Sequence, residues 1–134
     1  ICIKLVVTMK DEVLIEKANE VRKNSYSPYS NFSVGAAIQS IDGEVFLGTN
    51  IENQVNGLSI CAERVALFNA IKEGKRKFSK IAVMCSNDFC SPCGACRQVL
   101  YEHSPNLEII MANVEGEYKK TSLGQLLPEG FKLD

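Results

Sequence analysis

Hydrophobic positions recur along this chain with two different spacings, which predict helices in some segments and strands in others. Leu14, Ala18 and Val21 lie three and four positions apart with charged residues between them, which predicts an amphipathic helix. Residues 62–73 are apolar around much of the helical circumference and predict a largely buried helix that ends before Gly74. The expected helices are 11–24, 62–73, about 93–102, and a short one that is capped by Thr121 or Ser122 and ends before Pro128.

Shorter apolar runs between the helices predict five strands. Asp42-Gly43 separates the first two strands and is typical of a two-residue hairpin loop. The short turn at 113–116 implies that the last two strands pair antiparallel. The expected strands are 34–41, 44–49, 79–85, 107–111 and 117–120. This order of elements predicts one α/β domain over 1–134, in which helices cover both faces of a five-stranded mixed sheet in three α/β/α layers.

The composition is that of an ordinary globular domain. Hydrophobic residues make up 46% of the chain and charged residues 23%, which excludes a disordered chain. Lys and Arg number 15 against 16 Asp and Glu, and the formal net charge of −1 argues against a nucleic-acid-binding protein. No apolar run approaches the roughly 18 residues of a membrane helix. We therefore expect neither a nucleic-acid partner nor a membrane partner.

The first residues leave several interpretations open. The run Ile1–Val7 is short, contains Lys4 and lacks a small-residue cleavage site, so it does not look like a secretory signal. Residues 1–8 are an edge strand, an arm on a partner subunit, or an extension upstream of a start at Met9.

The chain has six cysteines, and their positions indicate chemistry rather than disulfide bonds. Without a secretory signal the expected compartment is the reducing cytoplasm, where clustered cysteines more often bind metal or act in catalysis. Cys85 ends an apolar run and is expected to be a small buried hydrophobic residue, and Cys90 an apolar residue at the turn from strand to helix. The cysteines are at positions 2, 61, 85, 90, 93 and 96.

Two cysteine motifs begin two of the expected helices. They are Cys61-Ala62-Glu63 and, after 31 intervening residues between Cys61 and Cys93, Cys93-Gly94-Ala95-Cys96 preceded by Pro92. Backbone N–H groups and the helix dipole at such positions favour thiolate over thiol. Three thiolates with one open position are a ligand set for a catalytic zinc ion. Glu63 can reach the open side without binding the metal, where a carboxylate can take a proton from water and pass it on.

Three blocks of the sequence resemble the cytidine deaminase family, in its small homotetrameric form with three cysteine ligands to zinc. The similarity extends over roughly residues 11–131. The blocks are 26–37 (YSPYSNFSVGAA), 50–53 (NIEN) leading into 60–64 (ICAER), and 91–98 (SPCGACRQ), with a weaker echo in 126–128 (LLP) and Phe131.

The resemblance implies hydrolytic deamination of cytidine and deoxycytidine to uridine and deoxyuridine, with release of ammonia, in cytoplasmic pyrimidine salvage. It implies one Zn²⁺ per subunit and a homotetramer with composite active sites. It assigns zinc binding to Cys61, Cys93 and Cys96, and proton transfer and contact with N3 of the base to Glu63. The substrate contacts that it assigns are the Ala62 backbone to the base carbonyl, the Ser91 carbonyl to the departing amino group, Asn50 and Glu52 to the ribose hydroxyls, Phe32 to the base, and Phe131 to a neighbouring subunit's pocket.

Arg64 meets a physical need of such a site. Three thiolates on Zn²⁺ leave a net charge of −1, which makes a water in the site less acidic. A guanidinium that donates to the thiolates withdraws part of that charge. We therefore expect Arg64 to compensate the charge of the zinc ligands.

Other readings remain open beside this one. Residues 54–57 (QVNG) depart from the family pattern, which leaves the nucleoside preference undecided and allows a modified cytidine or a blasticidin-like substrate. Cys90 with the other three cysteines could form a closed, purely structural four-thiolate zinc site. A deaminase of bases in RNA or DNA is disfavoured by the net charge and by the absence of tryptophan. His103, seven residues beyond Cys96, is expected on a helix surface rather than at the metal.

Overall fold

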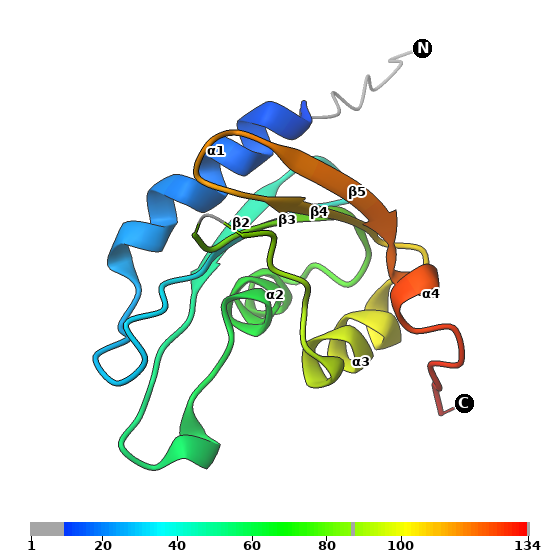
Figure 1. Cartoon of the computed structure of the whole chain (residues 1–134). Helices are drawn as coiled ribbons and strands as arrows, with labels where there is room; N and C mark the ends of the chain where they lie inside the picture. Colours follow the sequence, from blue (N-terminus) through cyan, green and yellow to red (C-terminus); the bar gives the residue numbers. More distant parts are fainter. Residues whose placement is uncertain (1–9, 87, 134) are drawn as a thin grey trace.

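The computed structural model describes residues 10–86 and 88–133, and in this part of the chain it contains the expected order of helices and strands (Figure 1). The alternatives for residues 1–8 lie outside the described residues. The longest helices have 11 residues, and none of the described helices is long and apolar enough to cross a bilayer. The elements are α1 (Asp11–Val21), the 3-10 helix η1 (Arg22–Asn24), β1 (Gly35–Ser40), β2 (Val45–Thr49), the 3-10 helix η2 (Asn56–Leu58), α2 (Ala62–Lys72), β3 (Phe78–Met84), α3 (Gly94–His103), β4 (Glu108–Ala112), β5 (Tyr118–Ser122) and α4 (Leu123–Leu126).

The five strands form one mixed sheet in the order β2-β1-β3-β4-β5. Neighbouring strands pair antiparallel except β3 and β4, which pair parallel. A parallel pair needs a crossover connection, and α3 supplies it. Helix α1 covers one face of the sheet, and α2 and α3 lie on the other (Figure 1), so the expected three-layer arrangement is confirmed.

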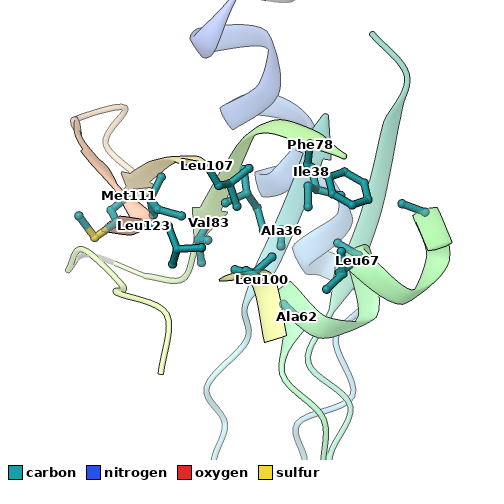
Figure 2. Packing of buried hydrophobic residues seen from close by; sticks show 14 residues of the cluster. Ala36, Ile38, Ala62, Leu67, Phe78, Val83, Leu100, Leu107, Met111 and Leu123 are labelled. Carbon is teal, nitrogen blue, oxygen red and sulfur yellow. The ribbon is translucent and has the colours of Figure 1, made fainter. Parts of the chain in front are cut away.

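Alternating residues along each strand supply two separate cores. On β1, Ala36 and Ile38 pack towards α2 and α3, whereas Ala37 packs towards α1. The parallel strands repeat the pattern, with Ile81 on the first side and Ala82 on the second. The core on the α2 side is the larger and is shown in Figure 2. It fixes the start of α2, because Ala62 at the first helical position is fully buried within it.

A glycine on each of the first two strands lets a helix approach the sheet closely. A Cβ atom at Gly48 on β2 would lie 2.3 Å from the backbone nitrogen of Ala66 in α2. A Cβ atom at Gly35 on β1 would lie 2.0 Å from the carbonyl oxygen of Ala18 in α1. Both clashes are with backbone atoms, so any side chain at either position would push the helix away from the sheet.

The structure differs from the sequence predictions mainly in the loops and at element ends. The predicted hairpin between β1 and β2 is confirmed, but the prediction of a two-residue loop is wrong. Ser40 donates its backbone N–H to the Glu44 carbonyl at 2.9 Å, which leaves three residues between them, and Gly43 has a φ of 96°. This is the three-residue loop that ends in a left-handed glycine. Of the two predicted caps, Ser122 begins α4, with its side chain bonded to the Gln125 N–H.

Candidate metal centre and catalytic pocket

Two helix starts bring three cysteine sulfurs together. Cys61 and Cys93 are the N-cap residues of α2 and α3, and Cys96 lies in the first turn of α3. The three Sγ atoms lie within 4.8 Å of one another, and those of Cys61 and Cys93 are 4.0 Å apart. Tetrahedral zinc with Zn–S bonds of about 2.3 Å needs sulfurs about 3.8 Å apart. The donor set and its spacing therefore fit one zinc ion.

The electrostatics around the cluster favour a thiolate at Cys61. A hydrogen bond with Cys96 and another from Arg64 lower the pKa of the Cys61 thiol to about 5. Arg64 Nη2 lies 3.5 Å from the Cys61 sulfur. Its Nε is buried and has no hydrogen-bond partner among the described residues. The hydrogen bond to Cys61, burial and the charge of Glu63 raise the pKa of Cys96, so Cys96 holds its proton and donates to Cys61.

Glu63 is buried beside the sulfurs, at the second position of α2. Only 6% of the residue is exposed. Burial raises the pKa of this carboxyl, and the negative charge of Cys61 raises it further. A carboxylate with a raised pKa is a stronger proton acceptor than an exposed one, which suits a proton-transfer group in catalysis.

A cavity of about 380 Å³ opens in front of Glu63 and two of the sulfurs. Seven of the residues that line it were expected from the sequence at a metal or substrate site. They are Phe32, Asn50, Cys61, Ala62, Glu63, Ser91 and Cys93. Two further lining residues, Val34 and Val83, were not expected there, and Cys90 was expected there only in the alternative of a four-thiolate zinc site. Val34 and Val83 belong to apolar runs that read equally well as core strands, so the sequence gives no signal for their place in the wall.

Asn50 and Glu52 hold the loop that forms one side of the cavity. Asn50 Nδ2 donates to the Phe32 carbonyl at 2.7 Å, and its Oδ1 accepts from the Val34 N–H at 2.9 Å. Glu52 accepts from the N–H of Tyr29 at 3.0 Å and from that of Ser30 at 3.2 Å. These contacts with the loop 25–34 were not predicted from the sequence.

Of the expected substrate residues, Glu52 and Phe131 do not line the main cavity. Glu52 faces a shallower polar cavity of about 250 Å³, together with Tyr26, Tyr29, Asn53 and Gln54. Phe131 is 64% exposed, and its carbonyl accepts from Gln98 Nε2 on α3 at 2.8 Å. The Phe131 ring is therefore free to contact another molecule.

The structure corrects the sequence prediction for two cysteines. Cys85 and Cys90 form a disulfide bond, because the loop after β3 returns and brings their Cα atoms to 6.1 Å. The prediction that they are simple apolar fillers was wrong, although Cys85 is fully buried as expected. The bond engages the fourth sulfur that a closed four-thiolate zinc site would need. His103 is the last residue of α3, with its ring 6.4 Å from that of Phe78, and does not join the sulfur cluster.

Comparisons with known proteins agree with this site. A family model for the cytidine and deoxycytidylate deaminase zinc-binding region matches residues 8–112. A cytidine deaminase from Halalkalibacterium halodurans is 43% identical over 125 residues, which are 92% of this chain and 95% of that protein. A crystal structure of cytidine deaminase from Burkholderia pseudomallei has a TM-score of 0.88 and 48% identity, covering 92% of this chain and 100% of that chain. A blasticidin-S deaminase from Bacillus cereus is 28% identical over 131 residues, 91% of this chain and 92% of that protein.

Proposed function

The chain belongs to the cytidine deaminase family of zinc-dependent hydrolases, and from that premise we propose how its own residues carry out the hydrolytic deamination of cytidine. Cys61, Cys93 and Cys96 hold the zinc ion. The observation that carries this proposal is the meeting of three sulfurs and one buried carboxyl, that of Glu63, at one cavity. Zinc held in this way supplies a water acidic enough to act as the nucleophile near neutral pH.

Glu63 moves the protons of the reaction. It accepts a proton from the attacking water and donates it to N3 of the pyrimidine, which makes C4 electrophilic. After the C4–O bond has formed, it accepts the remaining proton of the added hydroxyl and delivers it to the departing amino group as the C–N bond breaks. Cytidine and water become uridine and ammonia, and Glu63 returns to its starting state. The raised pKa of its carboxyl supports this role, because the group must exist in both protonation states during one turnover.

The base is held by groups on three sides of the cavity. The Ala62 backbone donates to the carbonyl of the base, the Ser91 carbonyl receives the departing amino group, and Phe32 packs against the ring. All three residues line the cavity. Ala62 is also at the first position of α2, where backbone N–H groups have no partner within the helix.

Asn50 and Glu52 bind the ribose hydroxyls with the hydrogen-bond donor and acceptor positions that their contacts with the loop leave unused. An amide NH₂ has two hydrogens, and Asn50 uses one of them on the Phe32 carbonyl. A carboxylate accepts about four hydrogen bonds, and Glu52 receives three, from the Tyr29 N–H and from the N–H and hydroxyl of Ser30. One donor and one acceptor therefore remain for a sugar with vicinal hydroxyls.

The nucleoside preference depends on the loop that follows Glu52. Gln54 lines the polar cavity beside Glu52, and Val55 is exposed next to it. We place cytidine and deoxycytidine ahead of blasticidin-like nucleosides, because the cytidine deaminase relative is 43% identical to this chain and the blasticidin-S deaminase 28%. A modified cytidine remains the alternative substrate that this loop would select.

The active unit is a homotetramer in which Phe131 enters the pocket of a neighbouring subunit. The described surface supports assembly, because several large apolar side chains are exposed on it, and one of them, Phe32, lines the cavity. Phe131 itself does not line the cavity of its own chain. The exposed apolar side chains include those of Phe32, Ile51, Val55, Leu58, Phe68 and Phe131.

The deamination is tested by the loss of cytidine ultraviolet absorbance with zinc-loaded protein. The wild type should convert cytidine to uridine, and Glu63→Gln with equal zinc content should be slower by at least a factor of about 100. Glu73→Gln is the matched control, because Glu73 follows the other end of α2 and pairs only with the exposed Lys72 among the described residues. A folded, zinc-loaded wild type that converts neither cytidine nor deoxycytidine would refute the proposed reaction.

A further inference from the structure

Arg97, on the first turns of α3, holds together two segments that are far apart in the sequence. Its Nε donates to the Pro92 carbonyl at 2.7 Å, and its Nη2 to the Ser91 hydroxyl at 2.7 Å. Its Nη1 donates to the carbonyl of Leu126, the last residue of α4, at 2.9 Å. One guanidinium therefore binds both the loop that precedes the zinc-ligand motif and the C-terminal segment.

All three of these acceptors are neutral oxygens. Within residues 10–86 and 88–133, Arg97 has no salt bridge to a carboxylate. Hydrogen bonds from a charged donor are stronger than those between neutral groups. A planar guanidinium also directs its N–H groups along fixed directions, which the single ammonium of lysine cannot do. The contacts of Arg97 therefore depend on the planar shape of its guanidinium group and not on an ion pair.

The peptide between Ser91 and Pro92 depends on Arg97 for its orientation. In the described part of the chain, neither residue makes a backbone–backbone hydrogen bond. Pro92 is buried and has no N–H to donate, so its carbonyl needs a partner, which Arg97 supplies. Arg97 holds this peptide from both sides, by the hydroxyl before it and the carbonyl after it. These bonds limit how this peptide can rotate beside the cavity that Ser91 lines.

The same helix also orients the C-terminal segment. Gln98, the next residue of α3, donates to the Phe131 carbonyl at 2.8 Å. A Cβ atom at Gly130 would lie 2.9 Å from the ring of Tyr101 on α3, so the segment passes directly against the helix. The bond from Arg97 to Leu126 therefore ties the loop at Ser91 to the segment that carries Phe131.

We propose that Arg97 is a positioning residue for the deamination, which aims the Ser91 carbonyl at the departing amino group and couples it to the C-terminal segment. This role rests on the proposed function, because it acts through the contact assigned there to Ser91. Arg97 is not among the residues that line the cavity, so it acts through Ser91 rather than on the substrate itself. Its effect belongs to the step in which the C–N bond breaks, and not to binding of the base and sugar.

The test compares turnover with binding in zinc-loaded Arg97→Lys. The kcat for cytidine should fall by a factor of about 10 to 100, as is typical for residues that orient catalytic groups. The inhibition constant of the ribonucleoside of pyrimidin-2-one should stay within about twofold, because this ligand carries hydrogen at C4 and gives the Ser91 carbonyl nothing to bind. Arg76→Lys is the matched control, since Arg76 also donates to two carbonyl oxygens, of Ile71 and Lys75, but on an exposed loop.

Two results would overturn the role. An unchanged kcat in Arg97→Lys would do so, and so would an equal loss of turnover and inhibitor binding, which would mean that Arg97 only maintains the shape of the pocket. If Arg97→Lys fails to fold or to hold zinc, Ser91→Ala decides, because it removes one acceptor and keeps the carbonyl. Its kcat should fall by a factor of about 2 to 10, and an unchanged kcat would refute the role. A wild type that fails to deaminate cytidine would instead refute the proposed function, and this role with it.

Discussion

Cys61 has a low thiol pKa because its neighbours on both helices stabilise the thiolate. Cys96 donates to its sulfur from α3, and Arg64 donates from one turn further along α2. Zinc binding requires deprotonated sulfur, so the cost of removing a proton at neutral pH enters the metal affinity directly. A ligand that is already a thiolate at pH 7 removes that cost for one of the three sulfurs.

Arg64→Gln should therefore weaken zinc binding and make it more dependent on pH. Without the guanidinium the pKa of Cys61 rises from about 5 towards its ordinary value of 9.0, so the metal must displace a proton from Cys61 over a pH range where Cys61 of the wild type has none to lose. The ratio of zinc affinities at pH 8 and pH 6, measured by competition with a chelator, should be about tenfold larger in the variant. Arg76→Gln serves as the control. Equal ratios in Arg64→Gln and the wild type would refute the compensating role of Arg64.

The residues of the site could be predicted from the sequence to different degrees. Cys61 and Glu63 were predictable because one short motif at a helix start determines where both side chains go. The contacts of Arg97 were not predictable, since its partners lie near residues 92 and 126 and meet only after the sheet has formed. The Cys85–Cys90 disulfide was missed for a related reason, because it depends on how the loop after β3 returns.

At the scale of elements, the Asp11 carboxylate in the first turn of α1 bonds two strands of the sheet. Asp11 bonds Lys80 of β3 at 2.9 Å and Lys120 of β5 at 2.8 Å. Lys80 is 7% exposed, and such a buried ammonium is costly unless it is paired. Asp11 also lies at the helix N-terminus, where a negative charge is favourable.

Asp11→Asn should lower the free energy of unfolding by about 1–3 kcal/mol at pH 7, since it removes the charge that Lys80 faces. The hydrogen bond from Lys120, and then that from Lys80, lower the pKa of the Asp11 carboxyl below its ordinary value of 3.8. Its contribution is therefore fully present above that value and is lost as the pH falls through the lowered folded-state pKa. Denaturant unfolding at pH 7 and near pH 3, at one protein concentration, should show the two proteins converge at the lower pH.

Glu16→Gln, on the exposed side of the same helix, is the control for this measurement. A difference in the free energy of unfolding between Asp11→Asn and the wild type that stays constant between the two pH values would contradict the assignment.

The helices and strands were largely predictable, because hydrophobic periods of two and of three to four residues show in the sequence. The hairpin loop was not, since Asp42-Gly43 fits both loop lengths and the bond between Ser40 and Glu44 selects the longer.

At the scale of the whole molecule, several large apolar side chains are exposed, and one of them lies at the cavity. Phe32 is 46% exposed at its rim. Leu58, on the loop that leads into Cys61, is 68% exposed. A single chain gains nothing from such surface, but a second copy that covers it would bury the apolar area and close the site. Phe131 is the side chain that we expect to supply part of that cover.

Mixing two impaired variants tests whether each site is built from two chains. The Glu63→Gln variant lacks the proton-transfer carboxyl but keeps a Phe131 that can enter the pocket of a neighbouring subunit. The Phe131→Ala variant keeps Glu63 but lacks that phenylalanine. Each should be slow alone, Phe131→Ala by a factor of about 10 or more. In co-expressed mixed oligomers, half of the sites keep Glu63 and half of those receive an intact Phe131, so activity should recover to about a quarter of the wild-type value.

The control replaces Phe131→Ala with a chain that carries both substitutions. A mixture of this chain with Glu63→Gln contains no site with Glu63 and should show no recovery. If the mixed oligomers of the single variants have only the average activity of the two, Phe131 acts within its own chain or not at all. Recovery above that average requires that Phe131 of one chain serve Glu63 of another, because no single chain in the mixture carries both.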